Sequence, residues 1–208
     1  MKTTIRSVPF NFGTMGLVED WASARNIING SNAAAQFLKL ASEAGEISEA
    51  LLNYEDHELG YDHDLLTDAI GDTLVVATII SAQLGFSAQE ALASFVKICD
   101  VNGTSPYDHD LTCSQVERQI SLLIGRIGDN IAKSNTDHVK AFIGDLIVKL
   151  DVLAHHHTTC LAECYDIAYE EIKDRKGIMH NGVFVKSTDP EYENLVLLYS
   201  GSDTAAAQ

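Results

Sequence analysis

The sequence predicts an all-α protein. Only three of its 208 residues are prolines, and no strand-like alternation of polar and apolar residues runs for long. Ala, Leu, Ile, Glu and Asp dominate, and apolar residues recur at helical spacing through most of the chain. The length suffices for one sizeable core or two small helical units.

The first half predicts four helices after an irregular stretch over residues 1–16. They cover residues 17–26, 36–52, 65–84 and about 87–99. Ser31 or Asn32 caps the second helix, and Gly85 ends the third. Ser87 and Glu90 have the spacing of a capping box, which opens the fourth helix.

The second half repeats this pattern after a linker at 101–110, where Asn-Gly and Pro signal turns. Three helices are expected, over residues 116–131, 136–155 and 160–175. Gly177 ends the last of them, and the tail contains a short extended piece and then frays. The repeated YDHDL at 61–65 and 107–111 resembles an Asp-based helix cap used twice.

Four carboxylates on two of these helices are the most informative feature. Glu43 and Glu46 lie at i and i+3, and Asp68 and Asp72 lie at i and i+4 on a helix that is apolar on nearly every side. Such a helix is expected to be buried, where an unpaired acid costs several kcal/mol or becomes neutral. A divalent cation between the helices removes that cost, and Mg²⁺, or Mn²⁺ as an alternative, suits carboxylate oxygens. The competing interpretation is a solvated acidic stripe that pairs with Lys or Arg.

Three neighbours of these acids are candidates for supporting roles. Gln36 and Lys39 lie on the same helical stripe as Glu43 and Glu46. Lys39 either contacts a phosphate or forms an i,i+4 ion pair with Glu43. Glu49 lies off this stripe, facing solvent or activating a water.

The composition excludes several classes of function. A formal charge of −16 disfavours binding to nucleic acid or to an anionic membrane. We expect no apolar run of membrane-spanning length, and no signal-peptide pattern is recognisable at the N-terminus. The four cysteines show neither zinc spacing nor a disulfide framework, so a reduced, cytoplasmic protein is expected.

An internal duplication is suggested by paired segments. IGDTLV at 70–75 matches IGDLIV at 143–148, and SFVKICDVNG at 94–103 parallels AYEEIKDRKG at 168–177. The expected units are residues 1–105, with the acidic site, and 106–186, with the basic KDRKG segment, followed by a tail at 187–208. Two degenerate repeats would then form a pseudo-dimer within one chain.

The two repeats differ in charge at related positions. The second-half counterparts of Glu43, Glu46, Asp68 and Asp72 are Arg126, Asp129, Ala141 and Asp145. Conversely, Lys173, Arg175 and Lys176 stand where the first half has Cys99, Val101 and Asn102. Acids from one half and bases from the other suit a metal-bound polyphosphate. The alternative for KDRK is a set of cations that matches a helix C-terminus.

Three segments resemble the MazG-like all-α nucleoside triphosphate pyrophosphohydrolases, phage-encoded members in particular. They are RNIINGSNAAAQFLKLASEAGEISEAL at 25–51, DAIGDTLVVATIISAQLGFSAQEAL at 68–92 and EIKDRKGIMHNGVFVK at 171–186. Glu43 and Glu46 match the first acid pair of the family pattern, and Asp72 matches the Asp of its Gly-Asp step. The third acid of the family usually stands where this chain has Ala69, and Asp68 is the substitute.

The resemblance implies Mg²⁺-dependent cleavage between the α- and β-phosphates, which gives a nucleoside monophosphate and pyrophosphate. The expected substrate is a deoxynucleoside triphosphate or another purine nucleotide, such as a guanosine alarmone. Asn29 and Gln36 are candidates to contact the base edge. Trp21 either stacks on the base or belongs to the core, and Asn181 contacts ligand or makes a turn. The protein would act in the cytoplasm, that of the host if it is phage-encoded, as a pseudo-dimeric monomer or a homo-oligomer.

Two other functions compete with this one. The loss of acids from one half suits a catalytically weak nucleotide-binding or regulatory protein. A purely structural helical partner protein is the third possibility. Pyrophosphate release separates the hydrolase from both, and stabilisation by nucleotide separates the second from the third.

Overall fold

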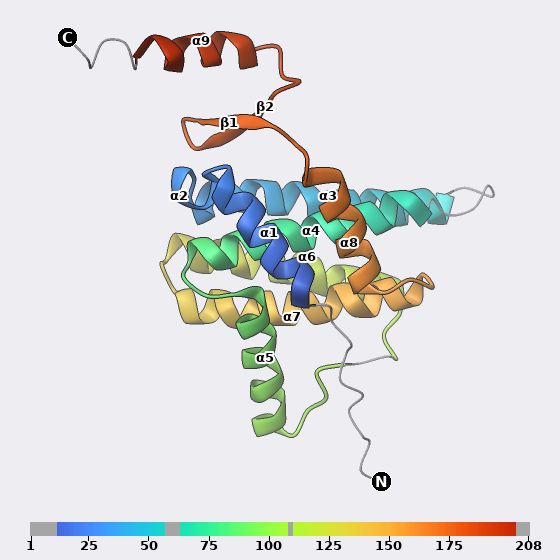
Figure 1. Ribbon diagram of the computed structural model, residues 1–208. Coiled ribbons are helices and arrows are strands. Elements are labelled where there is room, and N and C mark those ends of the chain that lie inside the picture. Colours follow the sequence, from blue (N-terminus) through green and yellow to red (C-terminus); the bar gives the residue numbers. More distant parts are fainter. Residues whose placement is uncertain (1–11, 57–62, 108–109, 203–208) are drawn as a thin grey trace.

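The computed structural model describes residues 12–56, 63–107 and 110–202 and is mostly helical, which confirms the all-α prediction (Figure 1). The elements in chain order are α1 Phe12–Ala24, α2 Ile27–Gly30, α3 Ala33–Asp56, α4 His63–Gln83, α5 Ala88–Asn102, α6 Cys113–Ala132, α7 Thr136–His156, α8 Leu161–Ile172, β1 Gly177–His180, β2 Val183–Lys186 and α9 Tyr192–Ser202.

Two of the predicted helix caps are confirmed, and a third is replaced by a different residue. Asn32 Oδ1 accepts a hydrogen bond from the Ala35 amide at 3.0 Å, so Asn32 caps α3. Ser87 and Glu90 form the predicted capping box of α5. Helix α6 begins with a second capping box, which uses Thr112 instead of the expected aspartate of the repeated YDHDL.

The C-terminal region differs most from expectation. Helix α8 ends at Ile172, and β1 and β2 form an antiparallel hairpin. Strand β2 lies in the region where a short extended piece was expected, whereas β1 was not expected. Asn181 and Gly182 form its turn with φ angles of 49° and 80°, the geometry of a two-residue hairpin turn. Beyond the hairpin, α9 was expected to be a frayed tail, yet it forms a helix that packs Leu195 inward and exposes Leu197.

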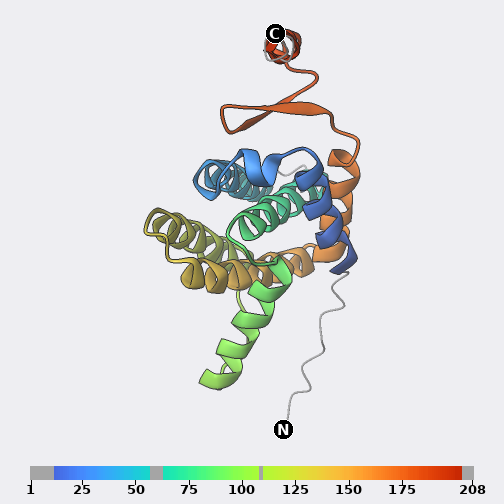
Figure 2. The same ribbon diagram turned by 60° about the vertical axis from the view of Figure 1, so that its left-hand side comes forward.

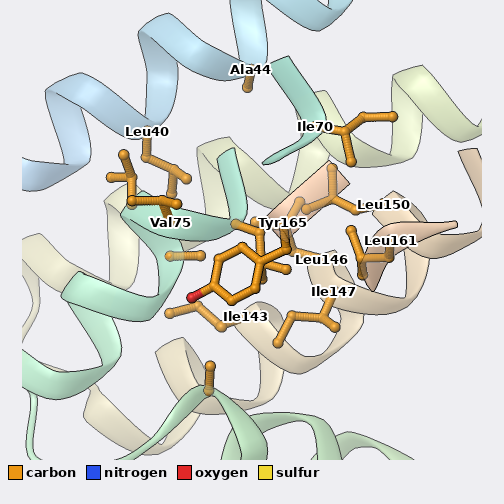
Figure 3. Close-up of a cluster of buried hydrophobic side chains, with 14 of the residues drawn as sticks. Leu40, Ala44, Ile70, Val75, Ile143, Leu146, Ile147, Leu150, Leu161 and Tyr165 are labelled. Atoms are coloured by element: carbon orange, nitrogen blue, oxygen red, sulfur yellow. The ribbon is translucent and has the colours of Figure 1, made fainter. Parts of the chain in front are cut away.

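Helix α4 is the central element, in contact with α3, α7, α8 and α1. Figure 3 shows how Ile70 and Val75 of α4 meet side chains from α3, α7 and α8 in one apolar cluster. Within it, the Tyr165 and Thr78 hydroxyls are hydrogen-bonded at 2.8 Å. The core therefore joins the first and second halves of the chain.

One expectation about α4 was wrong. Residues Asp64–Gln83 are long and apolar enough, by length and composition, to cross a membrane. Most of this segment's apolar window, 78%, is buried inside the protein. The run also contains buried Thr73, Thr78 and Ser81. Each of their hydroxyls donates a hydrogen bond to the carbonyl four residues earlier, so these side chains can be buried among apolar ones. Its apolar character is used by the core.

Two glycines reveal a pseudo-two-fold relation between the halves. A Cβ built on Gly71 of α4 would lie 2.3 Å from the Cys164 carbonyl oxygen of α8. A Cβ on Gly144 of α7 would lie 2.2 Å from the Ala91 carbonyl oxygen of α5. Positions 71 and 144 are 73 residues apart, and so are 91 and 164. The same close helix contact therefore occurs twice, at matching positions.

The third helices are exchanged between the halves. Helix α5 packs on α7 of the second half, and α8 packs on α4 of the first half. In Figures 1 and 2, α5 projects from one side of the α3/α4 and α6/α7 layers, while the hairpin and α9 lie on the opposite side. Helices α1 to α5 and helices α6 to α8 are consequently intertwined around one core.

This contact corrects the sequence alignment of the third helices by one residue. The shift of 73 that the glycine contacts require relates Lys173, Arg175 and Lys176 to Asp100, Asn102 and Gly103. Sequence similarity alone suggests a shift of 74, with Cys99, Val101 and Asn102 as the counterparts of these bases. Neither set contains a base, so the difference in charge between the halves holds.

Candidate functional site

A pocket lies where α1–α4 meet the end of α8 and strand β2. It has a cavity volume of about 80 Å³. Its lining residues are Trp21, Ile27, Gln36, Lys39, Glu43, Asp72, Val75, Val76, Ile79, Ile172, Arg175, Phe184 and Lys186. Because α8 and β2 come from the second half of the chain, both halves build this pocket.

The pocket gathers about half of the residues that the sequence singled out. Those lining it are Trp21, Gln36, Lys39, Glu43, Asp72 and Arg175. Those outside its lining are Asn29, Glu46, Glu49, Asp68, Lys173, Lys176 and Asn181. Of the second set, Glu46 and Asp68 still act on the pocket acids through their charge.

The acids of α3 and α4 form one electrostatic cluster. Burial raises the pKa of Glu43 to about 7, with further upward contributions from Asp72, Glu46 and Asp68. Burial likewise raises the pKa of Asp72 to about 6, with Asp68 as the largest like-charge contribution. Nearby like charges therefore make Glu43 and Asp72 harder to ionise.

Asp68 is the member of this cluster with a buried oxygen, Oδ1, that lacks a hydrogen-bond partner. Burial raises its pKa, and Glu171 and Glu46 raise it further. Glu171, on the exposed side of α8, is a fifth carboxylate near the cluster. It belongs to the EIKDRKG segment, where sequence reasoning considered only the bases.

The donor set is chemically suited to a hard divalent cation. Carboxylate oxygens are the preferred ligands of Mg²⁺, and a cation would relieve both the mutual repulsion and the unpartnered Asp68 Oδ1. Within the residues that the structure describes, no three His, Cys, Asp or Glu side chains are already arranged as a ligand group. Binding an ion would therefore require some of these side chains to turn toward one another.

Cations line the side of the pocket next to the acids. Arg175 lowers the pKa of both Asp68 and Asp72, so its charge reaches the cluster. Lys39 acts in the same direction on Glu43. Lys186 of β2 also lines the pocket, although sequence reasoning did not select it. Its position depends on the hairpin register, which the sequence did not reveal.

The other bases of the KDRK segment do not enter the pocket. Lys173 forms an ion pair with Glu170, three residues earlier on the surface. Lys176 is exposed, and its backbone carbonyl accepts a hydrogen bond from the Ser187 amide at 2.8 Å. Only Arg175 of this cluster therefore meets the acids.

The pocket lining also includes aromatic and apolar side chains. Trp21 and Phe184 meet edge to face, with ring centroids 6.1 Å apart. Trp21 is 8% exposed and part of the core, as the alternative interpretation held, but it also lines the pocket. Its indole Nε1 is buried and has no acceptor. Gln36, only 5% exposed, also lines the pocket, and its amide donates weakly to Ser31 Oγ at 3.4 Å.

Three other candidates have simpler structural explanations. Asn181 makes the hairpin turn, as one of its two interpretations held. Asn29 is exposed on α2, and Glu49 is exposed on α3, away from the lining residues. These positions favour the turn and solvent-facing alternatives.

The related position in the second half contains an internal ion pair. Arg126 and Asp145 correspond to Glu43 and Asp72. Arg126 lowers the pKa of Asp145, whereas in the first half Asp72 raises the pKa of Glu43. Lys149, which corresponds to Val76, places its Nζ 3.7 Å from Asp145 Oδ1. Asp129, the other acid that the second half retains, pairs with Lys133 at 2.7 Å, so each of these two acids has a lysine partner.

A stretch of the chain is similar in sequence to part of a phage protein. It is 33% identical over 66 residues to an uncharacterized 18.2 kDa protein from the rep-hol intergenic region of Haemophilus phage HP1. The match covers 32% of this chain and 36% of the phage protein, about a third of either. No family model and no solved structure matches the chain.

Proposed function

We propose that the protein is a Mg²⁺-dependent nucleotide pyrophosphohydrolase of the MazG-like type. The observation that carries this proposal is that acids, cations and aromatic side chains all line one pocket. A nucleotide has matching parts, because metal-bound phosphates would suit the acids and cations and a flat base would suit the aromatic rings. The substrate would be a deoxynucleoside triphosphate or another purine nucleotide.

The proposed metal ligands are Glu43, Glu46, Asp68 and Asp72. A bound Mg²⁺ would neutralise phosphate charge and lower the pKa of a coordinated water. Arg175, Lys39 and Lys186 would hold phosphate oxygens, because a guanidinium or ammonium group forms strong charge-assisted hydrogen bonds to them. Cleavage by water needs no covalent nucleophile from the chain.

The base would lie against the aromatic side chains. Trp21 and Phe184 supply flat apolar surface there, and the unpartnered indole N–H supplies a hydrogen-bond donor. The Gln36 amide supplies both a donor and an acceptor for a base edge. The proposed setting is the cytoplasm, and the phage relative supports a phage origin.

Matched variants of related aspartates test the proposal. Wild-type protein should release pyrophosphate from at least one member of a nucleotide panel in the presence of Mg²⁺. Asp72→Asn should abolish that release while helical content by circular dichroism stays unchanged. Asp145→Asn, the corresponding change in the second half, should leave turnover within about twofold of wild type. Near-wild-type turnover of Asp72→Asn at saturating Mg²⁺ would refute the site assignment.

A further inference from the structure

Arg25, at the end of α1, grips the chain just beyond α8. Its Nε donates to the Arg175 carbonyl oxygen at 2.6 Å, and its Nη2 donates to the Lys173 carbonyl oxygen at 2.8 Å. The guanidinium carbon also lies 5.0 Å from the centroid of the Trp21 ring. One side chain thus links the aromatic wall of the pocket to the segment that carries Arg175.

The chemistry of a helix C-terminus explains why a guanidinium serves here. The last carbonyls of a helix have no partner within the helix. Helix α8 ends at Ile172, and the chain then turns toward β1 at Gly177. A planar guanidinium offers several N–H donors in a fixed fork, so it can satisfy two carbonyls at once, whereas an ammonium group is a single flexible point.

These hydrogen bonds from Arg25 hold the backbone of Arg175, the base that lines the pocket. Arg175 is the member of the KDRK segment that lines the pocket, and its charge acts on Asp68 and Asp72. Arg25 binds the backbone of Arg175 itself. Releasing that carbonyl would free the segment that aims the Arg175 side chain.

We propose that Arg25 is a positioning residue that holds Arg175 at the phosphate end of the pocket. This inference rests on the proposed function and deepens it, because it assigns the phosphate-binding geometry to a contact between the N-terminal helix and the second half. Arg25 does not line the pocket, so it would act on phosphate only through Arg175.

A double-mutant comparison tests whether Arg25 works through Arg175. The variants are Arg25→Ala, Arg25→Lys, Arg175→Gln and the double variant Arg25→Ala/Arg175→Gln. Arg118→Ala is the control, because it removes the same charge from an exposed position lining a different pocket. The probe is magnesium pyrophosphate, and its binding is followed by the fluorescence of Trp21, the single tryptophan of the chain. Mg²⁺ affinity without pyrophosphate is measured by calorimetry.

Arg25→Ala and Arg175→Gln should each weaken magnesium pyrophosphate binding by about tenfold or more, the scale of a charge-assisted hydrogen bond. The double variant should be no weaker than Arg175→Gln alone. Mg²⁺ affinity should not fall in any of them, whereas general damage to the fold would lower both affinities. Arg25→Lys, which keeps the charge, should fold normally and still lose most of the pyrophosphate affinity.

A ligand-free measurement separates failure of this inference from failure of the proposed function. Amide hydrogen exchange over residues 173–177 should accelerate about tenfold or more in Arg25→Ala and Arg25→Lys but not in Arg118→Ala. If wild type binds no magnesium pyrophosphate, the proposed function fails, and the exchange result alone decides whether Arg25 fixes this segment. Unchanged exchange in both Arg25 variants overturns the inference. Additive losses of pyrophosphate affinity in the double variant overturn it as well.

Discussion

Glu43 and Asp72 link the pocket to the stability of the protein. Their pKa values rise from the ordinary 4.5 and 3.8 to about 7 and about 6. Between the ordinary and the raised values, the folded state binds more protons than the unfolded state. The contribution of these two carboxyl groups to the stability of the folded state is thus fully present below their ordinary pKa values. It is lost as the pH rises through their pKa values in the folded state.

We therefore predict that metal-free protein becomes less stable between about pH 4.5 and pH 7. The loss due to Glu43 should be about 1–2 kcal/mol, because solvent reaches half of this group and screens the interaction. Urea unfolding in EDTA at several pH values measures it. Glu43→Gln should flatten the curve, whereas Glu49→Gln, on the exposed face of the same helix, should not. Parallel curves for wild type and Glu43→Gln would show that the acid cluster is not coupled in this way.

Mg²⁺ should reverse this loss. At pH 7.5 the acids are mostly ionised, and an ion that binds only the folded state stabilises it in proportion to its occupancy. At a Mg²⁺ concentration 100 times its Kd, the gain should be about 2.7 kcal/mol, visible as a rise in Tm. Asp72→Asn should remove most of the gain, and Asp145→Asn should retain it. An equal rise in both variants would assign the effect to some other part of the chain.

Single residues were predictable where a helical stripe already fixed their direction. Glu43, Lys39 and Gln36 lie on one stripe of α3, and the spacing alone placed them together. Lys186 and Phe184 were not predictable, because their place depends on how the β-hairpin folds back over α3 and α4. Glu171 was not predicted as part of the site, because the bases of its EIKDRKG segment give the stronger signal.

At the scale of elements, two close helix contacts hold the exchanged arrangement together. Gly71→Ala would drive a methyl group against the Cys164 carbonyl and the Ala168 side chain. Gly144→Ala would do the same against the Ala91 carbonyl and Phe95. Backbone cannot move aside cheaply, so we predict a loss of about 3 kcal/mol of unfolding free energy for each, at the upper end of overpacking costs.

Thermal or urea unfolding measures these losses, with Gly125→Ala as the control. Gly125 lies within α6, and a Cβ there meets nothing within 4 Å. Alanine is the better helix former by about 1 kcal/mol, so this variant should be more stable than wild type. If Gly71→Ala and Gly144→Ala matched Gly125→Ala, the close approach of α4 to α8 and of α7 to α5 would be refuted.

Most elements followed from local sequence signals. Apolar periodicity and capping residues located α3, α4, α5, α6 and α7 within a few residues of their observed bounds. One short extended piece was expected near the hairpin, but its pairing with a second strand was not, because each strand contains only four residues, too few for a visible alternation. Helix α9 was missed because it was read as tail, although it packs on β1.

At the scale of the whole molecule, paired sequence segments predicted related halves, but they did not predict the exchange of the third helices. Paired Ile-Gly-Asp segments gave the shift of 73 that the Gly71 and Gly144 contacts also require. The packing of α5 on α7 and of α8 on α4 depends on long-range contacts. Two repeats of similar sequence do not specify which of the two long-helix pairs each of these helices joins. The exchange matters for the site, because it brings Arg175 from the second half beside Asp72 of the first.

The asymmetry between the halves predicts one metal–nucleotide site per chain. The second half has Arg126 and Lys149 beside Asp145, so an added divalent cation would meet positive charge there. Calorimetric titration with Mg²⁺ and a non-hydrolysable nucleotide should give a stoichiometry of about one per chain. Asp145→Asn should leave that value unchanged. Two equivalent sites per chain would contradict this assignment, although the hydrolase proposal itself would stand.

Phosphorus NMR of the products tests the central claim most directly. The protein is incubated with Mg²⁺ and a panel of nucleoside triphosphates in ¹⁸O-labelled water until one of them is consumed. Attack of water at the α-phosphorus should yield nucleoside monophosphate that carries the label, together with unlabelled pyrophosphate. Nucleoside diphosphate with labelled orthophosphate, or no turnover of any nucleotide, would contradict the account.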